Sequence, residues 1–437
     1  MSRKPWDKLI ASLRQTVGAF PDRRTGENTR YSMADIGLSA FSVFFTQSPS
    51  FLSAQTTLAK AKGRSNAQSL FQIQDIPCDN QIRQTLDPVA PDKLFPLYDQ
   101  VYQALLQADL LESFRAVHQT LLLALDGTWY FSSQNIHCPQ CCSLEHQSGA
   151  ITYYHSAVTP VIVAPGQPQA IALRPEFITP QDGHTKQDCE IAAAKRWLEK
   201  NGATYSPLKA TLLGDDLYAH QPFCRRTLLY NFHFIFVCKP DSHTTLYNWV
   251  NLLQRPELGT LKTRLKVGAH FHAYTYRYAN AVPLAEGEDA LQVNWCELTV
   301  TDSQGKVLYL NGWISDFKIT DENVAAIAAA GRARWKIENE NNNTLKTKGY
   351  HLEHNFGHGQ EYLASLLATM NILAFLFHTF LAFTDENYRL IRAELPTRET
   401  FFDDLRALTR YILFTNWDTL LDFMLRGLEI GPYAKPT

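Results

Sequence analysis

Residues 121–131 read LLLALDGTWYF, a continuous apolar run that contains a single acid. Such a run is typical of a strand in a sheet that is covered on both faces. Asp126 lies among five apolar residues and Gly127, and a carboxylate in this setting is costly to bury unless another group offsets its desolvation. Asp126 is therefore either a turn residue before Gly127 or part of a site at the strand end.

The segments that follow this run give the order of the elements. Strands are expected at 121–131, 150–165, 169–177, 211–215 and 232–240, and helices at 186–202 and 216–230. The order is three strands, helix, strand, helix, strand. It predicts an α/β fold in which a mixed sheet is flanked by helices.

Residues 241–320 interrupt this order. They are rich in aromatic and β-branched residues, and residues 302–305 (DSQG) supply a turn, so a β-rich insertion is expected here. A helix is then expected over 321–349, with an interior weakness at Gly331. The predicted domains are 1–115, 116–240, 241–320 and 321–437, of which the second and the fourth form one core.

Residues 1–115 show apolar residues at helical spacing and predict a helical domain. Within it, residues 65–87 (SNAQSLFQIQDIPCDNQIRQTLD) read as two short helices around a turn. Pro77 ends the first helix, and Ile82 and Leu86 share one face of the second. Two interpretations stay open: a helix-turn-helix that touches DNA, or two packed helices of a small bundle.

The composition excludes several classes of protein. The 437 residues include 41 Lys and Arg and 43 Asp and Glu, a formal net charge of −2, and 45% are hydrophobic. These values describe a folded globular chain, not a disordered chain or a uniformly basic nucleic-acid coat, although they allow a local basic groove. The N-terminus does not read as a signal peptide, and eight scattered cysteines favour a reducing, cytoplasmic location.

Residues 362–383 contain no Asp, Glu, Lys or Arg, over a length that could span a membrane. The segment nevertheless contains Ser, Thr, Asn and His, and the chain has no second segment of this kind. A helix buried inside a large domain is therefore the prediction, and no membrane partner is expected.

Two aspartates compete for a second strand-end site. Asp215 follows the apolar strand 211–214, and the C-terminal ends of strands are where open α/β sheets place their sites. Either Asp215 or Asp216 could instead cap the next helix. Asp215 is the preferred site acid, and Asp216 remains its rival.

Glu338 is the third candidate acid. Arg334 lies four residues before it, on the same face of the expected helix. Glu340 is turned about 200° away, so only one of the two glutamates can point inward. Glu338 is preferred because it is nearer the apolar side. That side is expected to contain Trp335, Ile337 and Leu345. A solvated helix with ordinary ion pairs is the alternative.

Three converging carboxylates suit Mg²⁺, or Mn²⁺ in its place, because hard cations take oxygen ligands. A pair of such ions can lower the pKa of an attacking water or hydroxyl and stabilise both oxygens of an in-line phosphoryl displacement. Basic residues beside the third acid can hold phosphates. These residues are Arg334, Lys336, Lys346 and Lys348.

The order of elements, the strand-end aspartates, the insertion and the helix-borne glutamate resemble insertion-sequence transposases of the DDE class, which have an RNase H-like catalytic core. The stretches LDGTWY, LGDDLYAHQPFC, FHFIFVCKPDSH and WKIENENNNTLKTKGYHLEHNFGHG carry the resemblance, which extends over nearly the whole chain. It implies that Asp126 and Asp215 are the catalytic aspartates, that Glu338 is the catalytic glutamate, and that all three bind metal.

A signature of related transposases, Y-x-x-R-x-x-x-E-x-x-x-x-x-x-K, fits this sequence in part. Arg334 and Glu338 are in register, but Gly331 replaces the Tyr, Leu345 occupies the Lys position and Lys346 lies one residue later. The roles of the Tyr and the Lys are therefore not carried over.

The resemblance implies a DNA transposase that binds terminal inverted repeats, cleaves at them with Mg²⁺ and joins the ends to target DNA. Double-stranded DNA and a second copy of the chain, as a homodimer on DNA, are the implied partners, and residues 1–115 would recognise the ends. The alternatives are a metal-dependent nuclease of the same fold that cuts without joining, and a non-catalytic DNA-binding derivative.

Cysteine and histidine residues raise two further hypotheses. Cys138 and Cys141 form a C-x-x-C pair that is preceded by His137, with His146 and His155 downstream, but a zinc site needs two more ligands at a matching spacing, and no second C-x-x-C exists. A loop of reduced thiols is preferred, and zinc stays open. His354 and His358 in HLEHNFGHG would suit a zinc hydrolase only on a helix, so a loop that contacts DNA or supports the active-site helix is preferred.

Overall fold

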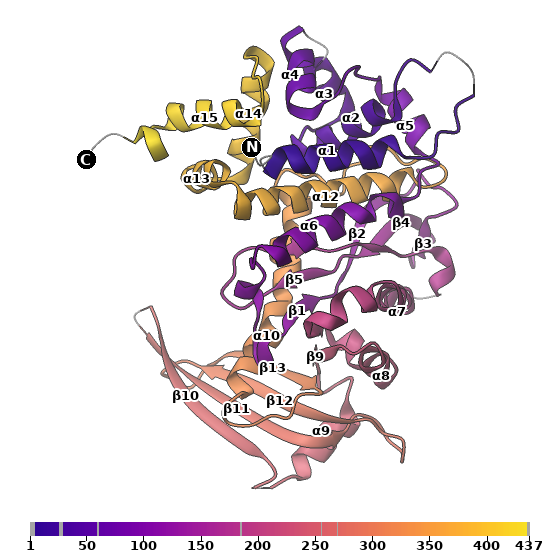
Figure 1. The fold of residues 1–437 in the computed structure, drawn as a ribbon. Coiled ribbons are helices and arrows are strands. Elements are labelled where there is room, and N and C mark those ends of the chain that lie inside the picture. Colours follow the sequence, from indigo (N-terminus) through magenta and orange to yellow (C-terminus); the bar gives the residue numbers. More distant parts are fainter. Residues whose placement is uncertain are drawn as a thin grey trace. The chain divides into compact units, whose positions relative to one another are not determined.

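The computed structural model describes residues 5–25, 29–58, 61–183, 186–254, 256–268 and 270–434 (Figure 1). Contacts divide the chain into two compact units. The first, called the helical unit, contains Met1–Leu110, Trp129–Ser156 and Asn341–Thr437. The second, called the sheet unit, contains Leu111–Thr128 and Ala157–Glu340.

A mixed sheet forms the frame of the sheet unit, with the strand order β10-β11-β12-β13-β9-β8-β1-β5-β6 (Figure 1). Its core strands are β1 (Leu121–Ala124), β5 (Val161–Val163), β6 (Ile171–Ala172), β8 (Ala210–Gly214) and β9 (His233–Val237). β5 is antiparallel to β1, and β6 is antiparallel to β5. β8 is parallel to β1, and β9 is parallel to β8. The predicted fold class, a mixed sheet with flanking helices, is confirmed.

Helices cover both faces of this core. On one face α10 (Val324–Arg332) packs in an apolar cluster that contains Ile235 of β9. Side chains alternate along a strand, so Phe236 points to the other face. There its ring centroid lies 5.8 Å from that of Phe223, in α8 (Gln221–Leu229). The ends of the core strands are therefore held in place from two sides.

The β-rich insertion is also confirmed, and it extends the central sheet. Its elements are α9 (Thr244–Leu252), β10 (Gly259–Val267), β11 (His270–Pro283), β12 (Gln292–Thr301) and β13 (Val307–Ser315). β13 pairs antiparallel with β9, where Ile314 lies opposite Phe236. The insertion thus covers what would otherwise be the edge of the core sheet.

The run 121–131 forms two strands, where one was expected. β1 ends at Ala124, and the chain then enters a second sheet. That sheet contains β2 (Gly127–Ser133), β3 (Cys142–Glu145), β4 (Ile151–Val158) and β7 (Glu176–Phe177). The segment 150–165 divides in the same way, into β4 and β5. Both halves of each segment are apolar, so hydrophobicity alone does not reveal the break.

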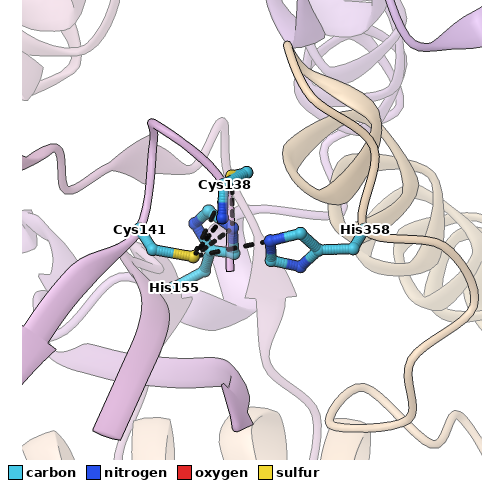
Figure 2. Close-up of side chains that lie close together, drawn as sticks. All are labelled: Cys138, Cys141, His155 and His358. Carbon is cyan, nitrogen blue, oxygen red and sulfur yellow. Dashed lines mark hydrogen bonds between the residues drawn. The ribbon is translucent and has the colours of Figure 1, made fainter. Parts of the chain in front are cut away.

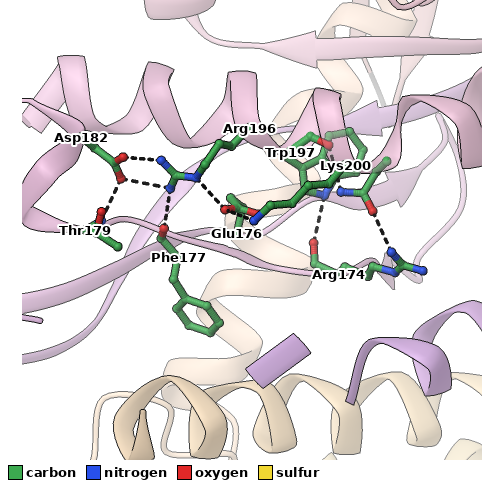
Figure 3. A network of polar contacts seen from close by, with 9 residues as sticks. Arg174, Glu176, Phe177, Thr179, Asp182, Arg196, Trp197 and Lys200 are labelled. Atoms are coloured by element: carbon green, nitrogen blue, oxygen red, sulfur yellow. Dashed lines mark hydrogen bonds and ion pairs between the residues drawn. The ribbon is translucent and has the colours of Figure 1, made fainter. Parts of the chain in front are cut away.

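A polar network holds α7 (Lys186–Tyr205) in the sheet unit (Figure 3). Arg196 donates to Oε1 of the buried Glu176 over 2.8 Å and to the carbonyl of Phe177 over 2.8 Å. Lys200 also reaches Glu176 Oε1, at 2.8 Å. Two cations that share one buried carboxylate fix the orientation of this helix.

α12 (Leu363–Thr384) is the central helix of the helical unit, and α1 (Pro5–Gly18), α2 (Met33–Phe45) and α6 (Phe95–Gln107) pack against it. It is long and apolar enough to cross a membrane, but 89% of its apolar stretch is buried in the protein. The prediction of a buried helix is confirmed. Two of its polar side chains have partners inside this unit: the Asn371 amide donates to the Tyr350 carbonyl over 2.8 Å, and His378 Nδ1 lies 2.6 Å from the Tyr350 hydroxyl.

The two short helices expected within 65–87 are α4 (Ala61–Phe71) and α5 (Asp79–Leu86). α4 ends six residues before Pro77, which therefore does not terminate it. Ile82 and Leu86 are buried, and α5 packs against α2 and α3 (Phe51–Leu58). The packing is that of a small bundle; contact with DNA stays a prediction.

The helix expected over 321–349 is interrupted. After α10 come a 3₁₀ turn (Ala333–Trp335), a π-helix (Ile337–Asn342) and α11 (Asn343–Thr347). A Cβ atom on Gly331 would collide with the Trp313 indole, so the glycine permits close packing of α10 rather than weakening it. The predicted apolar side is wrong at Trp335, which is 51% exposed, and right at Ile337 and Leu345.

Three further helices of the helical unit follow α12 in the described residues. These are α13 (Glu386–Glu394), α14 (Arg398–Tyr411) and α15 (Trp417–Leu428). α13 packs against α12 and α15, and α14 packs against α4. The eight cysteines all lie in described residues, and all are free thiols.

Candidate active site

The parallel pairing of β1 and β8 fixes the geometry of the two aspartates. Leu121 lies opposite Ala210, and the register continues to Ala124 opposite Leu213. The Leu125 N–H still donates to the Leu213 carbonyl, over 2.9 Å. Asp126 follows the end of β1 by two residues and Asp215 follows the end of β8 by one, so both come after the same ends of neighbouring parallel strands, which lie about 4.8 Å apart.

The pKa of the Asp126 carboxyl is raised far above its ordinary value. Burial, followed by the negative charge of Glu190, raises the pKa of Asp126 to about 7. The charges of Glu338 and Asp215 raise it further, whereas Arg334 opposes the shift. The negative charges of Glu190, Asp215 and Glu338, which come from different elements, therefore all act on the Asp126 carboxyl.

Asp215 and Asp216 differ in what their carboxylates contact. Asp215 Oδ1 accepts one hydrogen bond, from the Leu217 N–H over 3.0 Å, as the N-cap of the turn that follows β8. Asp216 Oδ1 accepts from the Lys239 N–H over 2.6 Å and lies 3.4 Å from His243 Nε2. Asp216 is thus engaged in joining two loops of the sheet unit.

The pKa values of Asp215 and Asp216 shift in opposite directions. Burial raises the pKa of Asp215, and the hydrogen bond from Leu217 only partly offsets this effect. For Asp216, burial is outweighed by hydrogen bonds from His243, Ser242 and the Lys239 N–H, which lower its pKa. Both the contacts and the pKa directions favour Asp215 as the acid available for a ligand.

Glu338 lies in the π-helix and is 51% exposed at its side chain. Its Oε1 pairs with Arg334 Nη2 over 2.7 Å, as the four-residue spacing predicted. Arg334 also lowers the pKa of both Asp126 and Asp215, so its positive charge acts on all three acids.

Glu190 is a fourth carboxylate, which sequence reasoning missed. It projects from α7 and is buried, with Oε1 accepting from the Gly127 N–H over 3.2 Å and from the Tyr218 hydroxyl over 2.8 Å. A Cβ atom on Gly127 would collide with the Glu190 carboxylate, so the glycine makes room for the acid. The only sequence signal for Glu190 is an acid beside the apolar stretch IAAA.

The predicted phosphate-binding residues fall in both units. In the sheet unit, Arg334 is paired with Glu338, and Lys336 Nζ donates to the Gln167 carbonyl over 2.7 Å. In the helical unit, Lys346 pairs with Glu353 over 2.8 Å, and Lys348 is exposed.

The donor set of the sheet unit consists of carboxylate oxygens from Asp126, Asp215 and Glu338, with Glu190 beside them. Hard divalent cations prefer such donors, and Mg²⁺ is bound by one or two carboxylates with water. A divalent cation would also neutralise the repulsion that raises the pKa of Asp126. The residues present therefore fit Mg²⁺ or Mn²⁺.

No protein-family model and no curated protein matches the chain. One similar solved structure is a cryo-EM structure of a piggyBac transposase synaptic complex with hairpin DNA. The match covers 98% of this chain and 88% of that chain, with 10% sequence identity and a TM-score of 0.36. A likeness of this size assigns no function, so an assignment has to come from the geometry of the acids.

Proposed function

We propose that the chain is a DNA transposase of the DDE class, a metal-dependent phosphoryl transferase that cleaves at terminal inverted repeats and joins the ends to target DNA. The observation that supports the proposal is the parallel pairing of β1 and β8, because Asp126 and Asp215 follow the same ends of these two strands. The charge of Glu338 acts on the Asp126 carboxyl.

In the proposed site, Asp126, Asp215 and Glu338 hold Mg²⁺ or Mn²⁺. When bound, such ions supply an activated water or 3′-hydroxyl and stabilise the oxygens of an in-line phosphoryl displacement. Arg334 orients Glu338 through their ion pair. Glu190 positions the start of β2 next to Asp126, through its hydrogen bond from Gly127.

The proposed partner is double-stranded DNA, as terminal repeats and as target. Arg334, Lys336, Lys346 and Lys348 hold its phosphates, and residues 1–115 recognise the ends. The reaction joins two ends, so we propose a homodimer on DNA, acting in the cytoplasm. Phosphate contacts make DNA binding weaken as salt concentration rises.

The test uses the purified full chain and supercoiled plasmid that carries the DNA flanking the gene. With Mg²⁺, wild-type protein is expected to nick at the repeats and to give strand-transfer products. Asp126→Asn, Asp215→Asn and Glu338→Gln are expected to lower nicking by about 100-fold or more, the size of losing one charge-stabilising group. Specific DNA binding is expected to remain, since binding depends mainly on other residues.

Two variants serve as matched controls. Asp216→Asn changes the neighbour of Asp215, and Glu340→Gln changes the acid two residues from Glu338; both are expected to keep nicking within a few-fold of wild type. Nicking without joined products would identify a nuclease of the same fold. Specific binding by wild type with no metal-dependent nicking would identify a non-catalytic derivative. Full nicking by Asp126→Asn would remove that residue from the site.

A further inference from the structure

Four side chains of the helical unit converge on one point (Figure 2). Cys138 and Cys141 come from the loop between β2 and β3, His155 comes from β4, and His358 comes from the loop before α12. One ligand atom from each lies within 4.8 Å of all the others. The fold thus brings His155, which follows the C-x-x-C pair in the sequence, and the distant His358 to the two cysteines.

The distances match those of a tetrahedral zinc site. With Zn–S bonds of about 2.3 Å and Zn–N bonds of about 2.0 Å, neighbouring ligand atoms lie roughly 3.3–3.8 Å apart. The two Sγ atoms are 3.9 Å apart, and His155 Nε2 lies 3.6 Å from Cys138 Sγ and 3.5 Å from Cys141 Sγ. His358 Nε2 lies 3.5 Å from Cys141 Sγ. Two sulfurs at 3.9 Å are also far beyond the length of a disulfide bond, about 2.05 Å.

A hydrogen bond and an aromatic ring help to hold these side chains in position. The Cys138 N–H donates to Cys141 Sγ over 3.4 Å. The Phe131 ring packs against both histidines, with centroids 5.8 and 4.4 Å away, and provides an apolar wall.

The loop that carries His358 is anchored independently of any metal. Arg83 Nε donates to the Phe356 carbonyl over 2.9 Å, two residues before the histidine. After it, the Asp87 carboxylate accepts from the N–H groups of Gln360, at 2.9 Å, and Glu361, at 3.0 Å. The histidine is therefore held in position by α5 and the residue that ends it, which reduces the ordering cost of binding.

We propose a structural zinc site in the helical unit, which ties the β2–β3 loop and β4 to the loop before α12. Its ligands are Cys138, Cys141, His155 and His358. Two sulfur and two imidazole ligands select zinc over magnesium, and four protein ligands leave no open position for a substrate. The site therefore stabilises the fold and takes no part in the phosphoryl chemistry proposed for the carboxylates.

The first measurement is metal content. The full chain, purified without chelators, is expected to contain one equivalent of zinc by elemental mass spectrometry. Cys138→Ser, Cys141→Ser, His155→Asn and His358→Asn are each expected to lower that content at least tenfold. Two matched controls are expected to retain it: Cys142→Ser changes the adjacent thiol, and His354→Asn changes a histidine of the same loop as His358.

A second test uses cobalt binding by the wild-type protein, so it does not depend on whether the variants fold. Wild-type protein, stripped of metal under reducing conditions and titrated with Co²⁺, is expected to show the visible absorption of a tetrahedral thiolate site, and Zn²⁺ is expected to abolish it. Asp126→Asn and Asp215→Asn are expected to keep full zinc content, so this proposal and the proposed function fail separately. Wild-type protein with no zinc and no cobalt absorption would overturn the site.

Discussion

Asp126 binds its proton more tightly in the folded chain than in the unfolded one, because burial and then the charge of Glu190 raise its pKa from 3.8 to about 7. Folding therefore retains a proton that the unfolded chain loses between about pH 4 and 7, and stability falls as the pH rises through this range. Each pKa unit corresponds to about 1.4 kcal/mol.

Asp126→Asn removes this titration and keeps the shape of the side chain. In magnesium-free buffer, the Tm of the variant is expected to exceed that of wild type by more at pH 8 than at pH 5. Asp216→Asn is the control, because the pKa of Asp216 is lowered and its own carboxylate is ionised at both pH values. A Tm difference for Asp126→Asn that is equal at pH 5 and pH 8 would contradict the raised pKa.

Gly127 and Glu190 form a pair whose coupling can be measured. Gly127→Ala is expected to lower the free energy of unfolding by about 1–3 kcal/mol, the usual cost of overpacking, since its Cβ would meet the Glu190 carboxylate. In a Glu190→Ala background the same change is expected to cost much less, which a double-mutant cycle by thermal unfolding would show. Gly427→Ala, a change with open space around it, is the control.

The acids show how far a sequence predicts a site. Asp126 and Asp215 are candidates from the sequence because each follows an apolar strand, where a carboxylate needs a special reason to be present. Glu338 is a candidate from its helical spacing to Arg334. Glu190 is not, because an acid within a helix is ordinary until the fold directs it at Gly127 and Tyr218.

At the scale of elements, the π-helix explains why buried residues recur every four positions along residues 333–345. Buried residues occur at 333, 337, 341 and 345, a spacing of four. In a regular α-helix each such step drifts by about 40°, whereas a π-turn accommodates an additional residue and absorbs the drift.

Nothing in the sequence indicates that the segments 121–131 and 150–165 each divide into two strands. The order of strands and helices was predictable from apolar runs and helical spacing, but the change of sheet at Asp126 was not, because apolar residues flank it on both sides. Long-range pairing decides which sheet each half joins: Ala124 pairs with Val161 and Leu213, whereas β2 pairs with β4.

The insertion provides a prediction at this scale. β13 covers β9 through three residue pairs, so replacing 241–315 by a flexible linker would expose an apolar edge strand. That variant is expected to lose soluble expression. Replacing only residues 264–273, at the tip of the β10–β11 hairpin, by Asn-Gly is expected to leave Tm within a few degrees, as most of this tip is exposed. Equal solubility of the two variants by size-exclusion chromatography would contradict a covering role for β13.

At the scale of the whole molecule, two kinds of donor set occupy different units. The sheet unit gathers carboxylate oxygens, and the helical unit gathers two thiols and two imidazoles. Hard and soft donors select different metals, so magnesium and zinc would not compete for one site. Because the chain passes between the units at 110, 128, 156 and 340, the zinc ligands are dispersed over segments that sequence spacing cannot bring together.

This division predicts which part of the chain becomes less protected from hydrogen exchange when zinc is lost. Local opening is confined to cooperative parts of a structure, so Cys141→Ser is expected to speed amide hydrogen exchange in peptides from 129–156 and 350–362 by tenfold or more. Peptides from β8 and β9 are expected to change little, because they belong to the sheet unit. Cys142→Ser, the adjacent thiol, is expected to leave all of these peptides near wild-type rates. Exchange measured by mass spectrometry that rises equally in both units would show that they unfold as one, and zinc would then stabilise the molecule as a whole.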